Sequence, residues 1–431
     1  MRILHTSDWH LGISTGPVSR LEEQAAFLDW LGRVLAEREV DALIVAGDIF
    51  DSMHPSAEAQ ALYFRFLAGV GGTGVRSVVV VGGNHDSASG LDAPRALLEA
   101  VDVTVVGGVP VEERRVERML VPLRLRGSAD DDPPAAICLA MPYVHEYRLG
   151  VRTTDLDLEG TRAAFRQAFG ALYTQLADAA VAQFGDLPLV ATGHLTLGAN
   201  VRREDYPQEI HQVGSIDALP SSILDARIRY AALGHIHRSL PVDKPRAWYS
   251  GSPIPYATTE MSARRQVLLV EIEGEAAPTV EPLPVPQQRD LVELLGTPDD
   301  VVERLAKLTW ETQLPPLVHA RVQVEAPESS LVQKLNDALL EHDEDRRPIL
   351  VEVQQRALAP PTDTQAKTTP VLDELEPRQV FEMLCEARGH VGETRAALLR
   401  AFAQIESADP AALDEMVADV HRAAVENVEA S

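Results

Sequence analysis

Short apolar runs alternate with helical patterns over the first 260 residues. The runs are nearly continuous in Val, Ile and Leu, which is typical of strands that are buried on both faces of a sheet. Strands are expected at residues 2–6, 41–46, 77–81, 187–192 and 229–233. Helices are expected at residues 20–37, 57–68 and 161–183. The pattern therefore predicts a buried sheet in an α/β fold.

Residues 116–141 break this pattern. They form two apolar segments around an acidic turn, GSADDDPP. Two strands joined by a polar turn predict a second sheet or an antiparallel edge.

The remainder of the chain divides by composition. Residues 263–357 predict a small α+β module, with strands at 266–272, 317–324 and 349–354 and helices at 299–308 and 329–340. Residues 358–372 are rich in Pro and Thr, as linkers are. Residues 373–407 contain two segments with apolar residues at helical spacing, and residues 408–431 form an acidic tail.

The length and the chain's N-terminal segment add three expectations. A chain of 431 residues exceeds the size at which one core usually stops growing, so two or more domains are expected. Apolar runs stay below the ~20 residues that span a bilayer, and the start lacks the features of a signal peptide. Cys138 and Cys385 lie in an apolar and a helical segment, so two buried free thiols and a reducing cytoplasm are expected.

The net charge of −26 argues against simple nucleic-acid binding, because polyanions repel each other unless basic groups are concentrated locally. Only 4 of the 39 basic residues are lysine. This bias is typical of genome composition and does not by itself indicate DNA binding. Binding of a negatively charged partner therefore has to be inferred from a specific site and not from the overall charge.

Polar clusters follow five of the apolar strands. The motifs are SDWH, GDIFD, GNHD, VATGH and GHIH, and their candidate ligands are Asp8, His10, Asp48, Asn84, His194, His235 and His237. A glycine directly precedes the first ligand in the last four motifs, which lets the backbone turn sharply. Because ligands bind beyond the carboxyl ends of strands in α/β sheets, the five clusters are expected to converge.

Carboxylate, amide and imidazole ligands together suit a pair of divalent ions such as Mn²⁺, Fe²⁺ or Zn²⁺. Two ions about 3.5–4 Å apart clamp the oxygens of a phosphodiester and supply hydroxide near neutral pH. Each motif alone is also compatible with an ordinary turn. The set in this order indicates two-metal phosphoester chemistry.

The same motifs carry a resemblance to a family. HTSDWHLG, GDIFD, GNHD, GH and GHIH, in this order, resemble the calcineurin-like metallophosphoesterases. HTSDWHLG and WYSGSP are similar to the SbcD-type DNA-repair nuclease subunits. The resemblance implies a four-layer α/β/β/α core at residues 1–262, a DNA-facing cap at 263–357, and a helix pair at 373–407 that docks on an SbcC-type coiled-coil ATPase.

The resemblance also implies a role for each site residue. Asp8, His10 and His237 would hold one ion, while Asn84, His194 and His235 would hold the other and Asp48 would bridge them. His85 would act on the leaving oxygen as a general acid, and Asp51 would hydrogen-bond His85. The implied cofactors are two divalent ions, Mn²⁺ first, with Mg²⁺, Fe²⁺ or Zn²⁺ as alternatives.

The implied activity is that of a Mn-dependent 3′-5′ double-strand exonuclease and single-strand or hairpin endonuclease. It would process DNA ends and secondary structures in repair and recombination, in the cytoplasm at the nucleoid and away from membranes. The resemblance implies a homodimer within a heterotetramer, with helices near 57–68 and 91–100 as the candidate contact.

Three alternatives remain open at this point. A phosphatase or cyclic-nucleotide phosphodiesterase for a small substrate would share all seven ligands. A scaffold protein could keep the fold without catalysis, although such proteins tend to lose ligands. The C-terminal helices could pack on their own domain instead of on a partner.

Overall fold

The computed structural model describes residues 1–109, 116–129, 131–151, 156–198, 219–261 and 263–357, with four further single residues. The chain forms two compact units, Met1–Leu358 and Ala359–Ser431. In the second unit the described residues include Phe381 and Phe402, whose rings stack with their centroids 4.5 Å apart. The predicted linker and acidic tail, and most of the predicted helix pair, lie outside the described residues.

The first sheet has six strands in the order β14-β13-β1-β4-β5-β6. Its strands are β1 (Arg2–Thr6), β4 (Ala42–Ala46), β5 (Ser77–Val81), β6 (Val103–Val106), β13 (Gln266–Glu271) and β14 (Thr279–Pro284). β1, β4, β5 and β6 run parallel, and β13 pairs antiparallel with β1. The carboxyl ends of four parallel strands therefore share one edge.

The second sheet has the order β11-β12-β10-β9-β8-β7. Its strands are β7 (Leu120–Leu123), β8 (Ala136–Leu139), β9 (Leu189–His194), β10 (Ile228–Gly234), β11 (Leu240–Asp243) and β12 (Ala247–Tyr249). β7 pairs antiparallel with β8 at one edge, which confirms the two strands and the antiparallel edge predicted for residues 116–141. β8, β9, β10 and β12 are parallel.

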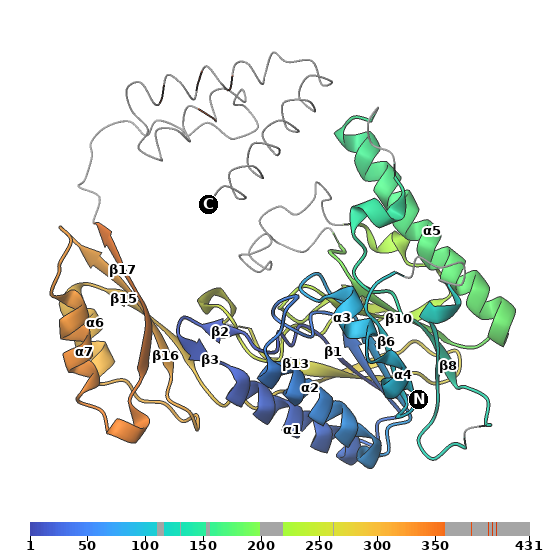
Figure 1. The fold of residues 1–431 in the computed structure, drawn as a ribbon, viewed down its shortest axis with the longest axis horizontal. Coiled ribbons are helices and arrows are strands. Elements are labelled where there is room, and N and C mark those ends of the chain that lie inside the picture. The colour runs from blue at the N-terminus through green and yellow to red at the C-terminus, as the bar shows by residue number, and fades with distance from the viewer. Residues whose placement is uncertain are drawn as a thin grey trace, which may run out of the picture. The chain divides into compact units, whose positions relative to one another are not determined.

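Helices cover the outer faces of the two sheets. On the first sheet α1 (Leu21–Glu37) and α2 (Ala57–Val70) lie side by side, followed by the short α3 (Ala88–Asp92) and α4 (Arg95–Glu99) (Figure 1). On the second sheet lies α5 (Leu158–Phe184). No helix among the described residues is long and apolar enough to cross a membrane.

Strand β4 shows why these strands read as continuous apolar runs. Ala42 and Ile44 belong to the core between the two sheets, which extends to Tyr173 of α5. Leu43 and Val45 belong to the core under α1 and α2. Because both faces of the strand are buried, every position is apolar. The predicted four-layer α/β/β/α core is confirmed.

The predicted start of the cap at residue 263 is too early. β13 and β14 complete the first sheet of the core, because β13 uses the free edge of β1. The cap proper is a parallel sheet of β15 (Leu291–Gly296), β16 (Leu317–Val324) and β17 (Ile349–Ala357), with helices α6 (Pro298–Ala306) and α7 (Leu331–Leu339). Both helices pack on the cap sheet through apolar residues such as Val301 and Leu335.

A buried ionic cluster joins the cap to the core. The carboxylate of Glu23, in α1, accepts hydrogen bonds from Arg20 at 2.6 and 2.7 Å and from Arg289 at 3.0 Å. Arg289 precedes β15 and also donates to the carbonyl of Pro315 at 2.6 Å. The three charged side chains are at most 6% exposed. A small hairpin of β2 (Ser14–Thr15) and β3 (Val18–Ser19) lies beside this cluster in sequence.

Candidate metal centre

All seven predicted ligands meet at one edge of the sandwich. Asp8 and His10 follow β1, Asp48 follows β4, and Asn84 follows β5 of the first sheet. From the second sheet, His194 ends β9, while His235 and His237 follow β10. The site therefore lies where the carboxyl ends of both sheets face each other.

One group of ligand atoms comes from Asp8, His10 and His237, which lie within 4.8 Å of one another. Nε2 of His10 is 3.1 Å from Nε2 of His237. An ion with bonds of about 2.0–2.1 Å to imidazole nitrogen would hold two such nitrogens at about this spacing. Nδ1 of His10 is buried without a hydrogen-bond partner among the described residues.

A second group of donors also combines residues from both sheets. Oδ1 of Asn84 is 3.1 Å from Nε2 of His194 and 3.0 Å from Nδ1 of His235. Nδ1 of His194 is in turn 2.9 Å from the carbonyl of Ala46, which can only accept, so the proton of His194 lies on Nδ1. Nε2 is then the ring nitrogen that faces the centre of the group.

Asp48 lies between the two groups. Its Oδ2 is 3.1 Å from Nε2 of His194 and 3.6 Å from Nε2 of His10. Its Oδ1 accepts the backbone N–H of His85 at 2.9 Å. One carboxylate oxygen thus faces ligands of both groups, while the other holds the neighbouring loop.

The pKa shifts in the cluster show how strongly it favours positive charge beside Asp48. Burial opposes the shift, yet the charge of nearby histidines, His194 first, lowers the pKa of Asp48. Burial also opposes protonation of His194, but Asp48 raises the pKa of His194 to about 9. Burial lowers the pKa of His235 to about 3, so this imidazole stays neutral at neutral pH. A buried carboxylate that recruits a proton in this way is suited to a cation.

The backbone at the ligands adopts an unusual conformation. φ is positive at Asp8 (53°), His10 (42°), Asp48 (50°) and His235 (96°). Close approach is also needed at Gly83, where a Cβ would stand 2.1 Å from Oδ1 of Asp48. Only glycine fits there, because a methyl group would displace the carboxylate.

The structure corrects the predicted contact between Asp51 and His85. Nδ1 of His85 is 2.9 Å from the main-chain carbonyl of Asp51, not from its carboxylate. The carboxylate Oδ1 instead lies 3.4 Å from Nδ1 of His10. The two residues do meet, but a neutral carbonyl fixes the His85 ring, because the chain turns at Asp51 and sends the side chain toward His10.

Two further residues shape the site and escaped the sequence reasoning. The buried carboxylate of Asp86 accepts the N–H groups of Ile49 (3.0 Å), Phe50 (2.9 Å) and Gly83 (2.8 Å), which joins two ligand loops. Its position in GNHD was a usable signal. Glu260 accepts from Nδ1 of His237 at 2.8 Å and has no motif of its own.

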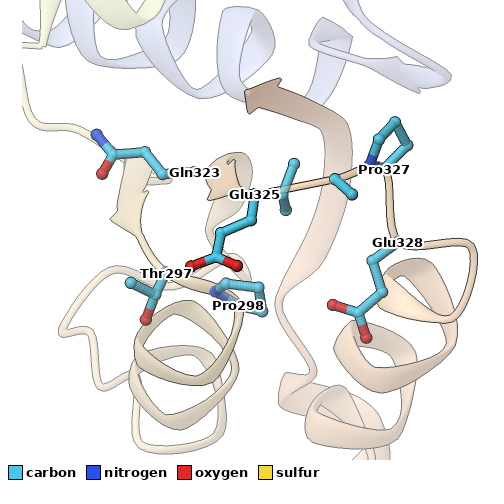
Figure 2. A pocket seen from close by; sticks show the side chains of 8 residues that line it. Thr297, Pro298, Gln323, Glu325, Pro327 and Glu328 are labelled. Atoms are coloured by element: carbon cyan, nitrogen blue, oxygen red, sulfur yellow. The ribbon is translucent and has the colours of Figure 1, made fainter. Parts of the chain in front are cut away.

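A separate hollow lies in the cap, between the start of α6 and the loop after β16 (Figure 2). Glu325 and Glu328 line it, together with Thr297, Pro298 and Gln323. Glu328 is already paired with Nζ of Lys334 at 2.6 Å. No histidine lines the hollow, so the convergent chemistry of the described residues is at the sheet edge.

The sequence of this chain matches known proteins along most of its length. The family model described as calcineurin-like phosphoesterase matches residues 1–254. The SbcD subunit of the SbcCD nuclease from Rhodobacter capsulatus is 35% identical, over 86% of this chain and 92% of the relative. Its namesake in Escherichia coli K12 is 34% identical, over 74% and 76%, and the one in Bacillus subtilis is 32% identical, over 64% and 68%.

The donor atoms and the matches agree. The groups of aspartate and histidine suit divalent metal ions, and members of the matched family are phosphoesterases by description. The chain belongs to the calcineurin-like phosphoesterases and, within them, to the family of SbcD subunits of SbcCD nucleases.

Proposed function

We propose that this chain is the nuclease subunit of an SbcCD-type complex and hydrolyses phosphodiester bonds of DNA at the seven-ligand cluster. The cluster carries the proposal, since both groups of donors and the Asp48 oxygen between them lie at one edge of the sandwich. The named relatives favour DNA over the small substrates of other phosphoesterases. Retention of every ligand argues against a scaffold without catalysis.

In this proposal Asp8, His10 and His237 hold one divalent ion, and Asn84, His194 and His235 hold the other. Asp48, whose Oδ2 lies near His10 of one group and His194 of the other, would help to hold both ions. When bound, two such ions neutralise charge on phosphate oxygens and make water nucleophilic at neutral pH. Mn²⁺ is the proposed ion, as the resemblance to SbcD-type subunits implies, and the mixed carboxylate, amide and imidazole donors are compatible with it.

His85 is the proposed general acid. Since the carbonyl of Asp51 can only accept, Nδ1 of His85 carries a hydrogen, and Nε2 remains to give or take a proton. The ring is partly exposed and lies 4.8 Å, centroid to centroid, from the ring of His10. Nε2 can therefore protonate the departing 3′ oxygen while Asp51 keeps the ring in place.

Because the chain is acidic, other groups have to provide part of its attraction to DNA. A net charge of −26 repels a polyanion, so the ions and a partner supply the attraction. The proposed partner is an SbcC-type coiled-coil ATPase that docks on the segment 373–407. The proposed homodimer contact uses α2 and α4, where Phe64 and Leu97 are 37% and 78% exposed.

The proposed function is tested by incubating the purified chain and Mn²⁺ with open duplex DNA, end-blocked duplex DNA and bis-p-nitrophenyl phosphate. Each substrate is assayed with and without the ATPase partner. Cutting of DNA that EDTA abolishes and Mn²⁺ restores is expected. Polarity follows from duplexes labelled at the 3′ or the 5′ end.

Asp48→Asn provides the site-specific comparison, because the proposed bridge loses its charge while the shape is kept. We expect this variant to lose cleavage of every substrate. Hydrolysis of the small ester alone by the wild-type chain, with DNA left intact in all combinations, would defeat the nuclease proposal.

A further inference from the structure

The histidines of the metal centre differ in what holds their second ring nitrogen. His194 and His85 are held by backbone carbonyls, of Ala46 and Asp51, each at 2.9 Å. Nδ1 of His10 makes no hydrogen bond among the described residues, although Oδ1 of Asp51 lies 3.4 Å away. His237 differs from these three, because its Nδ1 is hydrogen-bonded to the carboxylate of Glu260 at 2.8 Å.

Glu260 is built into its position. It ends a 3-10 helix, Thr258–Glu260, and its side chain is 13% exposed. Oε2 accepts the N–H of Tyr256 at 3.1 Å and lies 3.4 Å from Nη1 of Arg265. With Oε2 held by these two groups, Oε1 is directed at His237 alone.

Arg265 holds the backbone of both His237 and Glu260. Its Nη1 donates to the carbonyl of His237 at 2.9 Å and to Oγ of Ser252 at 2.8 Å. Its Nη2 donates to the carbonyl of Glu260. One guanidinium therefore ties the backbone of His237 to the backbone of Glu260, which sets the distance that the carboxylate has to span.

A carboxylate on Nδ1 has two effects on a ligating imidazole. It keeps the proton on Nδ1, so the Nε2 lone pair points into the site, and it makes that lone pair a stronger donor. In this structure Nε2 of His237 points at Nε2 of His10, within the group that includes Asp8. The effect of Glu260 is thus directed at that one group.

We propose that Glu260 is a positioning residue that orients His237 and strengthens the ion site of Asp8, His10 and His237, with little effect on the site of Asn84, His194 and His235. The proposal rests on the proposed ligand assignment. The two sites would then differ in their affinity for Mn²⁺ because of Glu260, which is not itself a ligand.

The test measures Mn²⁺ binding to the ion-free full-length chain by titration calorimetry, with no substrate present. Glu260→Gln keeps the shape of the side chain and removes its charge. We expect two sites in the wild type, and in Glu260→Gln one site weakened about 10- to 100-fold and one unchanged. Glu260→Asp, which is charged but one methylene short, is expected to weaken the same site.

A double-mutant cycle separates positioning from general structural support. If Glu260 acts through His237, then Glu260→Gln should cause no further loss of Mn²⁺ affinity in a His237→Ala background. Losses that add up in the double variant would overturn the proposal. Equal weakening of both sites, or of neither, would overturn it as well.

The matched control is Glu352→Gln. Glu352 also contacts a histidine, His319, with Oε2 and Nδ1 3.1 Å apart, but in the cap sheet. Both Mn²⁺ affinities should stay unchanged in this variant. A wild-type chain that binds no Mn²⁺ would reject the proposed function itself, whereas two wild-type sites that are unaffected by Glu260→Gln would reject only the role of Glu260.

Discussion

At the scale of single residues, the ligands hold conformations that their side chains do not favour. Asp8, His10, Asp48 and His235 all have positive φ, which costs on the order of 1–3 kcal/mol per residue. The hydrogen bonds of the cluster offset this cost. The N–H of His235, for example, donates to Oδ1 of Asp8 at 2.8 Å across the two sheets. Strain is concentrated where side chains must turn out of a strand into a shared centre.

His85 supports a prediction about catalysis. His85→Ala should lower DNA cleavage by about 10²–10⁴-fold, because the proton for the leaving oxygen is lost. Binding of Mn²⁺ should persist, since the seven ligands remain. Cleavage rates and calorimetric titration with Mn²⁺ measure the two properties. His342→Ala is the control, because His342 also contacts a carbonyl, that of Leu305 at 2.8 Å, but in the cap; a normal rate for His85→Ala would exclude the assigned role.

His5 supports a prediction about pH. It is fully buried, with Nδ1 2.9 Å from the hydroxyl of Tyr230 and Nε2 3.2 Å from the carbonyl of Leu233. Burial lowers the pKa of His5 from its ordinary value of 6.5 to about 3. Between these pH values the unfolded chain binds a proton that the folded chain does not bind. The free energy of unfolding therefore falls as the pH falls through this window.

His5 changes the free energy of unfolding by at most about 1.4 kcal/mol per pH unit. His5→Gln can still donate and accept a hydrogen bond. It should reduce the slope of the free energy of unfolding against pH by up to that amount between about pH 6 and about pH 4, which lie inside the window. Urea unfolding in EDTA measures it without interference from metal ions. Equal slopes for the variant and the wild type would show that His5 is not responsible.

At the scale of elements, the loops after β4 and β5 act as one piece because Asp86 joins them. Asp86→Ala leaves three buried N–H groups without their acceptor, at about 1–3 kcal/mol each. We expect the free energy of unfolding to fall by about 3 kcal/mol or more. Denaturant unfolding in EDTA measures the loss.

Asp92→Ala is the matched control for that substitution. Asp92 accepts one backbone N–H, that of Gly107 at 2.9 Å, so about a third of the loss is expected. Equal losses in the two variants would contradict the idea that Asp86 joins two loops.

The elements also show what could be predicted from the sequence. β1 and β5 have the predicted bounds, because their apolar runs end at polar ligands. β14 was not predicted, since its sequence, TVEPLP, contains two prolines, which a strand tolerates only at an edge. That β13 adds to β1 depends on a pairing between distant segments, which local patterns do not encode.

The same division applies to the metal centre. The convergence of the seven proposed ligands could be predicted because each follows a recognisable strand. Glu260 could not, because its importance comes from a contact with His237 that only the folded chain creates. The carbonyl of Asp51 is similar, because a main-chain atom leaves no trace in a sequence.

At the scale of the whole molecule, the Arg20–Glu23–Arg289 cluster connects cap and core. Glu23→Gln leaves two buried guanidinium groups with a neutral partner, and breaking a buried ion pair costs about 3–5 kcal/mol. We expect a loss in this range, measured by urea unfolding. Glu303→Gln is the control, because Glu303 pairs with Lys307 on the surface, where ion pairs contribute about 0–1 kcal/mol. A loss for Glu23→Gln no larger than for this control would refute the assigned strength.

In the first sheet β1 lies between β4 and β13, so this sheet can be completed only after β13 has been synthesised. A ribosome adds about 5–20 residues per second, so on the order of ten seconds or more separates the synthesis of β1 from that of β13. Until then one side of β1 is an open strand edge, the kind of edge to which other chains add. His237 and Glu260 are also made late. A nascent chain thus carries its first proposed ligands, Asp8 and His10, beside an unfinished edge, and even the last proposed ligand, His237, is made before β13 can close that edge.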